Sequence, residues 1–198
     1  MAYLVPDGLP RGDHTDGHNA ELETLELLRR RLAPAYTVYH GVHWTRGWMA
    51  TPVFGEADFV IVNRSGSVLV IEQKRGALEE GASGLSKRYD GQLKSVPSQI
   101  HRTLDGLRDK FKRQTGHSLD VDYLLYCPDH RVRKLAAAGL DSERIVDATQ
   151  AVRLPERITG VLAEGTASAA GQRVARFRWH TNRAGCRRDH RRRPDEAR

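Results

Sequence analysis

The stretch GEADFVIVNRSGSVLVIEQKRG (55–76) decides how this chain folds. Two apolar runs, 59–63 and 68–74, lie on either side of the turn-forming residues RSGS. Apolar, β-branched runs separated by Gly and Ser are typical of two strands joined by a hairpin loop. The stretch therefore predicts an antiparallel hairpin whose loop is Arg64–Gly66.

A three-residue loop at 64–66 sets the register of this hairpin. It places Asp58 directly opposite Glu72, and directly opposed Cβ atoms on one sheet face are about 4.5–5.5 Å apart. Side chains alternate along a strand, so Lys74 is expected on the Glu72 face and Gln73 on the other. A loop one residue longer or shorter would shift the register and separate the two carboxylates.

Two carboxylates this close repel each other, and a divalent cation between them removes the conflict. Oxygen ligands of this kind suit Mg²⁺ or Mn²⁺, which can activate water and neutralise charge on a phosphate oxygen. Lys74 could then stabilise the transition state of phosphodiester hydrolysis. The same register also places Glu56 opposite Lys74, which allows an ordinary cross-strand ion pair instead.

A helix is expected to begin near Asn19, a good N-cap residue, and to end before Pro34. On a helical wheel Glu21 falls on the apolar stripe formed by Leu25, Leu28 and Leu32. A carboxylate on a buried face is costly unless it has a partner, so Glu21 is a third candidate acid.

The rest of the chain predicts an α/β core with a central mixed sheet flanked by helices. Residues 76–95 are expected to form a long loop or irregular hairpin. The predicted strands are 36–44, 122–127, 145–146 and 173–180, and the further helices are 97–114 and 151–163. We expect an extended lead-in at 1–18, one domain at 19–182 and a disordered tail at 183–198.

The net charge of +7 on 198 residues is unevenly distributed. The tail 183–198 holds seven Arg against three acidic residues, a net of +4, which leaves +3 for the other 182 residues. Overall basicity is therefore weak support for a nucleic-acid partner. The tail is interpreted either as a solvated segment that contacts nucleic acid or as the result of a truncation or an out-of-frame end, and the second interpretation is favoured.

The sequence does not favour several classes of protein. No apolar run approaches the roughly 20 residues of a membrane-spanning helix, and the N-terminus lacks the pattern of a secretory signal. Cys127 and Cys186 form no CxxC motif, so neither a structural zinc site nor a disulfide scaffold is expected. These features predict a cytoplasmic protein.

Other candidate residues have plainer interpretations. His40 and His43, three apart on a strand, are expected on opposite faces with structural or surface roles. In the 76–95 segment Tyr89 could stack on a base. Three cations there could contact phosphates but are usually only solvated: Lys87, Arg88 and Lys94.

At these residues the chain resembles the nuclease-related domain (NERD) family, a branch of the PD-(D/E)xK restriction-endonuclease-like superfamily. The matching pieces are Glu21, GEADFVIV with Asp58, VLVIEQK with Glu72 and Lys74, and VPSQ with Gln99. The resemblance covers about residues 15–150. It implies a restriction-endonuclease-like core with the active site at one edge of the sheet.

The resemblance further implies roles for individual residues. Asp58 and Glu72 would bind the metal, helped by Glu21 and the backbone carbonyl of Gln73. Lys74 would act in catalysis, and Gln99 would position substrate or Lys74.

The implied activity is Mg²⁺- or Mn²⁺-dependent DNA cleavage alongside a helicase or ATPase module. Ala57 stands where the superfamily has Pro, and no Walker A motif is present, so the helicase part is missing from this chain. A non-catalytic module that binds nucleic acid or another partner on the same fold is the alternative.

Overall fold

The computed structural model describes residues 1–6, 16–46, 53–134, 137–163, 173–174 and 176–181. Its centre is a six-stranded sheet in the order β1-β2-β3-β4-β8-β9. These strands are β1 (Tyr3–Val5), β2 (Tyr36–Arg46), β3 (Val53–Asn63), β4 (Val68–Gln73), β8 (Val121–Cys127) and β9 (Ile145–Asp147). The pairs β2–β3 and β3–β4 are antiparallel and the others are parallel. The expected α/β fold with a central mixed sheet is therefore confirmed.

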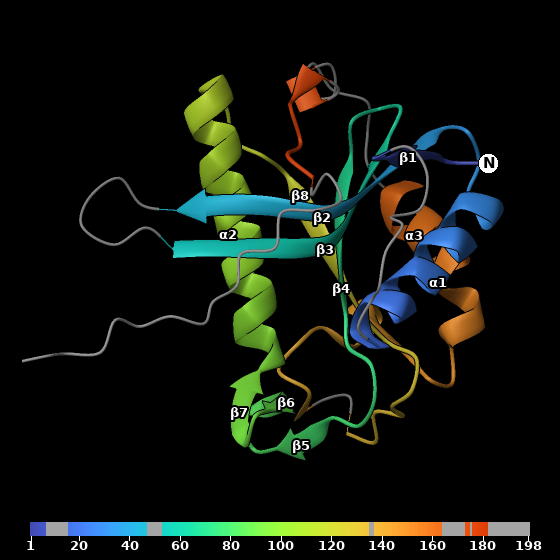
Figure 1. Cartoon of the computed structure of the whole chain (residues 1–198), viewed down its shortest axis with the longest axis vertical. Coiled ribbons are helices and arrows are strands. Elements are labelled where there is room, and N and C mark those ends of the chain that lie inside the picture. Colours follow the sequence, from blue (N-terminus) through green and yellow to red (C-terminus); the bar gives the residue numbers. More distant parts are fainter. Residues whose placement is uncertain (7–15, 47–52, 135–136, 164–172, 175, 182–198) are drawn as a thin grey trace, which may run out of the picture.

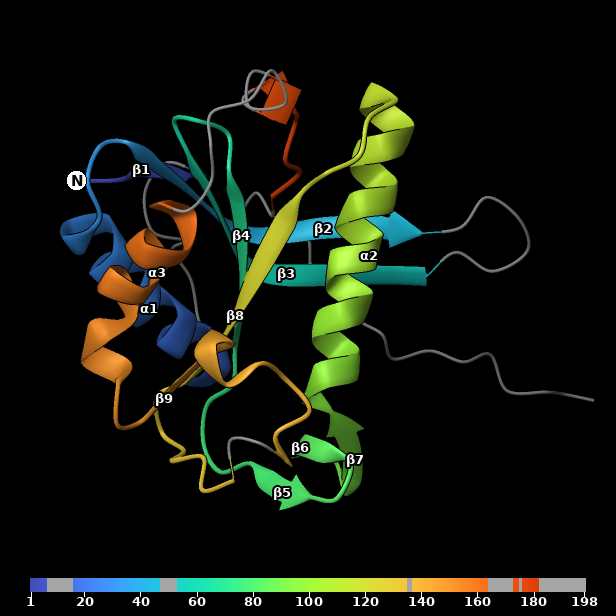
Figure 2. The same ribbon diagram turned by 180° about the vertical axis from the view of Figure 1, so that it is seen from behind.

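Helices cover both faces of this sheet, α1 and α3 on one side and α2 on the other (Figures 1 and 2). They are α1 (Asp16–Arg31), α2 (Val96–Thr115) and α3 (Leu154–Ala163), and the 3-10 turns η2 (Ser142–Arg144) and η3 (Ala151–Arg153) precede α3. The predicted stripe of Leu25, Leu28 and Leu32 is buried against the sheet. Within the described ranges no helix is long and apolar enough to cross a bilayer.

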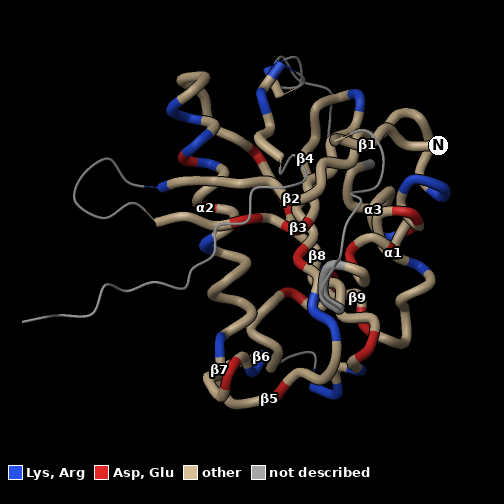
Figure 3. The backbone as a smooth tube through the Cα atoms, viewed as in Figure 1, with Lys and Arg blue, Asp and Glu red and all other residues tan. Residues whose placement is uncertain are grey.

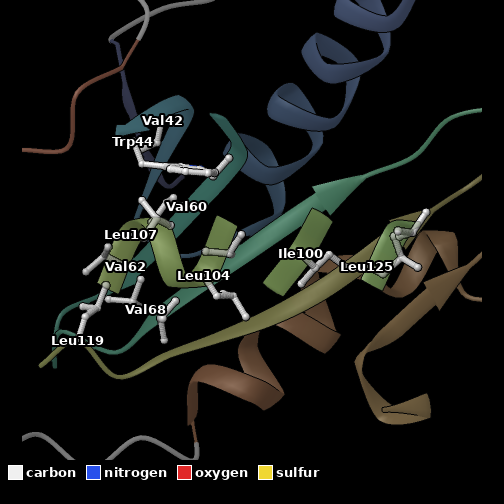
Figure 4. Close-up of a cluster of buried hydrophobic side chains, with 14 of the residues drawn as sticks. Val42, Trp44, Val60, Val62, Val68, Ile100, Leu104, Leu107, Leu119 and Leu125 are labelled. Carbon is white, nitrogen blue, oxygen red and sulfur yellow. The ribbon is translucent and has the colours of Figure 1, made fainter. Parts of the chain in front are cut away.

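The α2 side holds the larger apolar cluster, part of which Figure 4 shows. Trp44 lies at the point where β2 and β3 pack on α2. A Cβ added at Gly55 or Gly106 would come within 2.1 or 2.2 Å of the Trp44 ring. Only glycine therefore allows β3 and α2 to approach this indole so closely.

The central hairpin forms in the predicted register. Phe59 pairs with Ile71 and Val62 with Val68, which leaves the expected three-residue loop at 64–66. Strand β4 is buried along its whole length between β3 and β8. A strand covered on both faces reads as a continuous apolar run, which explains the sequence VLVI.

Three local differences from the sequence predictions are found. Tyr3–Val5 form a strand that pairs with β2, so the lead-in is partly structured. Helix α1 begins at Asp16, before the expected Asn19. The segment predicted as a long loop or irregular hairpin contains a separate three-stranded sheet of β5 (Glu79–Gly81), β6 (Gly84–Tyr89) and β7 (Gln92–Ser95).

The predicted strand at 173–180 is wrong. Residues 173, 174 and 176 are helical, and Thr181 makes an isolated bridge to Val42. Val174 and Phe177 are both buried in the α2-side cluster. Their three-residue spacing fits one helical turn, and this packing prevails over the strand propensity of the segment. The tail 183–198, with Cys186, lies outside the described residues.

Candidate active site at the fork of the sheet

The candidate site lies where β3 separates from β4. Pairing between these strands ends at Phe59 and Ile71, whereas β4 continues beside β8 as far as Gln73. The Gln73 backbone N–H donates to Oδ2 of Asp58 at 2.7 Å. The Asp58 carboxylate thus accepts the hydrogen bond that a neighbouring strand would otherwise have taken, which satisfies a buried donor.

The alternation of faces along β3 also changes at Asp58. Phe59 belongs to the apolar cluster on the α1 side, yet Ala57, two residues away, belongs to the cluster on the α2 side. The register places Gly41 of β2 opposite Asp58, and Gly41 has a positive φ of 63°. This left-handed conformation, which glycine adopts readily, shifts the alternation by one residue on β2 as well.

Glu72 is the most enclosed acid of the site, with 1% of its surface exposed. Its Oε1 accepts hydrogen bonds from Nζ of Lys74 at 2.6 Å and from Nε2 of Gln99 at 2.7 Å. Its Oε2 is buried and has no hydrogen-bond partner among the described residues. Glu72, Lys74 and Gln99 thus lie together, and one carboxylate oxygen remains available to a ligand.

Burial and like charge raise the pKa of both central acids. Burial raises the pKa of Asp58 well above its usual range, and repulsion from Glu72 raises it further. Burial also raises the pKa of Glu72, although the nearby Lys74 opposes this shift. Burial alone would lower the pKa of Lys74, but the charges of Glu72 and Asp58 outweigh it, and the net shift is upward. Lys74 is therefore protonated at neutral pH.

Glu21 approaches the site from helix α1. Its Oε2 lies 2.9 Å from Nε2 of His40, whose ring stacks on Phe59 with centroids 5.4 Å apart. The negative charge of Glu21 acts on both Asp58 and Glu72. The predicted acid on the apolar stripe therefore reaches the carboxylate pair, and His40 is its partner.

Glu56 joins this group, which the sequence interpretation missed. The side chain of Glu56 is 44% exposed, and its partial burial raises its pKa, to which the charge of Glu21 adds. Its Oε2 lies 3.7 Å from Nδ1 of His43. The suggested ion pair between Glu56 and Lys74 is wrong, because β3 has left β4 at this point and Lys74 pairs with Glu72. The two-residue spacing to Asp58 was the available signal.

The two histidines also differ from the prediction of opposite faces. Because the alternation shifts at Gly41, His43 lies on the α1 side of the sheet, as His40 does. Both act on the charge of Glu56. Figure 3 shows the resulting concentration of acidic positions along β3 and β4 near the centre of the molecule, with basic positions directly after β4.

The side chains at this site carry oxygen donors, which is the ligand type that a hard divalent cation prefers. Asp58 and Glu72 supply carboxylate oxygens, and the unpartnered Glu72 Oε2 is a buried acceptor of the kind that such an ion satisfies. Across the described part of the chain, no three His, Cys, Asp or Glu side chains are already arranged around one metal position. In this structure the Lys74 ammonium instead balances the charge of Glu72.

Comparison with known proteins identifies one family that this chain matches. The model of the nuclease-related domain family matches residues 16–128, which is more than half of the chain and includes every acid of the site. Comparisons with curated proteins and with solved structures give no match.

Proposed function

The chain belongs to the nuclease-related domain family, and we propose that it hydrolyses phosphodiester bonds in DNA with Mg²⁺ or Mn²⁺. The observation that carries the proposal is the meeting of Asp58, Glu72 and Lys74 at the fork between β3 and β4. Buried acids with raised pKa values beside a protonated lysine are characteristic of catalytic sites.

Asp58 and Glu72 would hold the metal ion, assisted by Glu21 and the Gln73 backbone carbonyl. When bound, such an ion lowers the pKa of a coordinated water and neutralises charge on a phosphate oxygen. The free Oε2 of Glu72 offers an acceptor on the carboxylate whose other oxygen is already engaged.

The remaining side chains would orient the carboxylates and stabilise the charge that develops on the substrate. Lys74 retains its proton and supplies a fixed positive charge for the negative charge that develops on the phosphoryl oxygens. The Gln99 amide holds Oε1 of Glu72 at 2.7 Å, so the carboxylate cannot rotate without losing this bond. His40 restrains Glu21 in the same way from the other side of the sheet.

The cellular setting is part of the proposal. DNA is the proposed substrate, and a helicase or ATPase module is the proposed partner in DNA processing or repair. We place this activity in the cytoplasm.

The proposal is tested with the full chain and labelled single-stranded and duplex DNA, with RNA in parallel, in Mg²⁺, Mn²⁺ or EDTA. We expect cleavage of DNA with either metal and none in EDTA. Glu72→Gln should lower the rate by a factor of about 10²–10³, because a charged group central to the transition state is lost. Glu143→Gln, at a side chain that is 75% exposed, is the matched control.

Undiminished cleavage by the Glu72→Gln protein would contradict the assignment. Binding of DNA with no cleavage in either metal would instead support the alternative of a non-catalytic module.

A further inference from the structure

The small sheet presents a rigid hairpin beside the candidate site. Strands β6 and β7 pair from Ser86 with Ser95 to Tyr89 with Gln92. The two residues between them, Asp90 and Gly91, have positive φ values of 46° and 81°. Two such residues in the order Asp-Gly form the tight type I′ turn that matches strand twist. The turn and the strand pairing therefore define which side chains share each face of the hairpin.

One face of this hairpin points towards the end of β4. Tyr89 and Gln92 are cross-strand partners, as are Lys87 and Lys94, so all four side chains share one face. The ammonium of Lys87 donates to the backbone carbonyls of Arg75 and Ala77, the first and third residues after Lys74. An ionised Tyr89 would also raise the pKa of Lys74, which puts the two side chains within electrostatic range of each other. Figure 1 shows the same proximity of the small sheet to the end of β4.

The exposed part of this face combines an aromatic ring with a positive charge. Tyr89 is 38% exposed, and Nζ of Lys94 lies 5.4 Å from the centre of its ring. Lys87 and Arg88 have polar partners within the protein, whereas the interaction found for the exposed Lys94 is with this ring. From Ser86 to Ser95 there are three basic residues and one acidic residue, Asp90.

A flat aromatic ring beside an exposed cation fits a ligand that carries both a planar base and a phosphate. Base–aromatic stacking tolerates any base, because every base has a π face, and a nearby cation follows the backbone. A base inside a duplex is already stacked on both sides, so an unpaired base is the better match. A purely acidic protein surface would use Lys94 but leave the ring unused.

We propose that Tyr89 and Lys94 bind an unpaired nucleotide of a nucleic-acid strand next to the cleavage site. The ring stacks on the base, and the ammonium contacts an adjacent phosphate. This inference deepens the proposed nuclease function, since the site at Glu72 and Lys74 acts on the strand that the hairpin holds. The substrate would then be a nucleic acid that is single-stranded, or frayed, beside the scissile phosphate.

The test is binding of a fluorescent single-stranded oligonucleotide to the full chain in EDTA, followed by anisotropy over a range of salt concentrations. Tyr89→Ala should weaken binding about tenfold, and Tyr89→Phe should restore it, because stacking needs the ring and not the hydroxyl. Tyr3→Ala, at a tyrosine that is 63% exposed, should have no effect. Lys94→Ala should reduce the slope of binding against salt by about one.

Thermal melting of each variant shows whether it is folded, and the Tyr89→Phe comparison remains informative if Tyr89→Ala is not. Equal weakening for a blunt duplex, unchanged affinity in Tyr89→Ala, or failure of Tyr89→Phe to restore binding would each overturn the inference. The outcome is separable from the proposed function. A Tyr89-dependent affinity without any cleavage would support the binding surface and contradict the nuclease, whereas cleavage that ignores Tyr89 would do the reverse.

Discussion

Two halves of one extended stretch, Val68–Ile71 and Glu72–Lys74, are similarly buried but differ in chemistry. The first half has β3 on one side and β8 on the other, and apolar side chains fill both faces. Beside the second half, β3 has turned away and the Asp58 carboxylate takes its place. Burial in the first half stabilises the fold by removing apolar surface from water. Burial in the second half excludes water and so strengthens the electrostatic interactions between the charged groups of the site.

This comparison also explains how a lysine can be buried beside the core. The Lys74 ammonium lies within 2.6 Å of Glu72, so neither charge is left without a partner. A buried ion pair of this kind contributes little net stability, because desolvation of both groups offsets their attraction. The proposed catalytic role would account for its presence.

The largest expected effect is a loss of folding stability when the apolar half is changed. Ile71→Ala removes a fully buried side chain from the α1-side cluster, and we expect the free energy of unfolding to fall by about 2–5 kcal/mol. Val152→Ala, at a side chain that is 80% exposed, should change it by no more than about 0.5 kcal/mol. Urea titration measures both. A loss in Ile71→Ala as small as the control's would mean that this half of β4 does not anchor the sheet.

The second prediction concerns the pH dependence of stability at the charged half. The pKa of Asp58 is above its usual 3.8 in the folded protein, because burial and Glu72 disfavour its charge. The folded protein then binds this proton more tightly than the unfolded chain, so stability falls as pH rises from about 3.8 through the folded pKa. We expect Asp58→Asn, measured in EDTA, to be more stable than the parent at pH 7, with the difference vanishing below pH 3.8.

Thermal melts across this pH range check that prediction, and the exposed Asp120→Asn controls for the loss of one charge. If Asp58→Asn were less stable than the parent at pH 7, the hydrogen bond to Gln73 would outweigh the cost of burying the carboxylate.

The smallest effect is expected at the edge of the site. Gln99→Leu removes the hydrogen bond to Oε1 of Glu72, and we expect cleavage to slow about tenfold, or about 1.4 kcal/mol in the barrier. Gln114→Leu, exposed on the same helix, is the control. The rate with saturating DNA is the measurement. A rate equal to that of the control variant would show that Lys74 alone positions Glu72.

Much of this site could be predicted from the residues of the hairpin. The Arg64–Gly66 loop determined the register as far as Phe59 and Ile71, and a period of two placed Lys74 on the Glu72 face. The predicted direct pairing of Asp58 with Glu72 does not form, because β3 leaves β4 there and Asp58 accepts from the Gln73 N–H instead. Glu21 was found because its position on the helix conflicted with its charge. Both inferences rest on local geometry that a short segment imposes by itself.

The contribution of Glu56, His40 and His43 could not be predicted in this way. It depends on the change of alternation at Gly41 and Asp58, beyond which β2 and β3 stay paired and Trp44 packs against α2. Strict alternation placed the two histidines on opposite faces and paired Glu56 with Lys74. The three strands of the small sheet were not predicted individually either, since Leu85 and the neighbouring Leu78 are buried against distant segments of the α2-side cluster rather than in a local apolar run.

The sequence by itself determined the central hairpin, the apolar stripe of α1 and the identity of the three main acids, because periodicity and loop length act over a few residues. Only the tertiary structure decided where β3 leaves β4, which oxygen of Glu72 stays unpartnered, and that Tyr89 lies near Lys74. These features arise from contacts between segments far apart in the chain, such as Gln99 with Glu72 and Lys87 with the carbonyl of Arg75. Close packing around a shared core selects such contacts, and no local pattern encodes them.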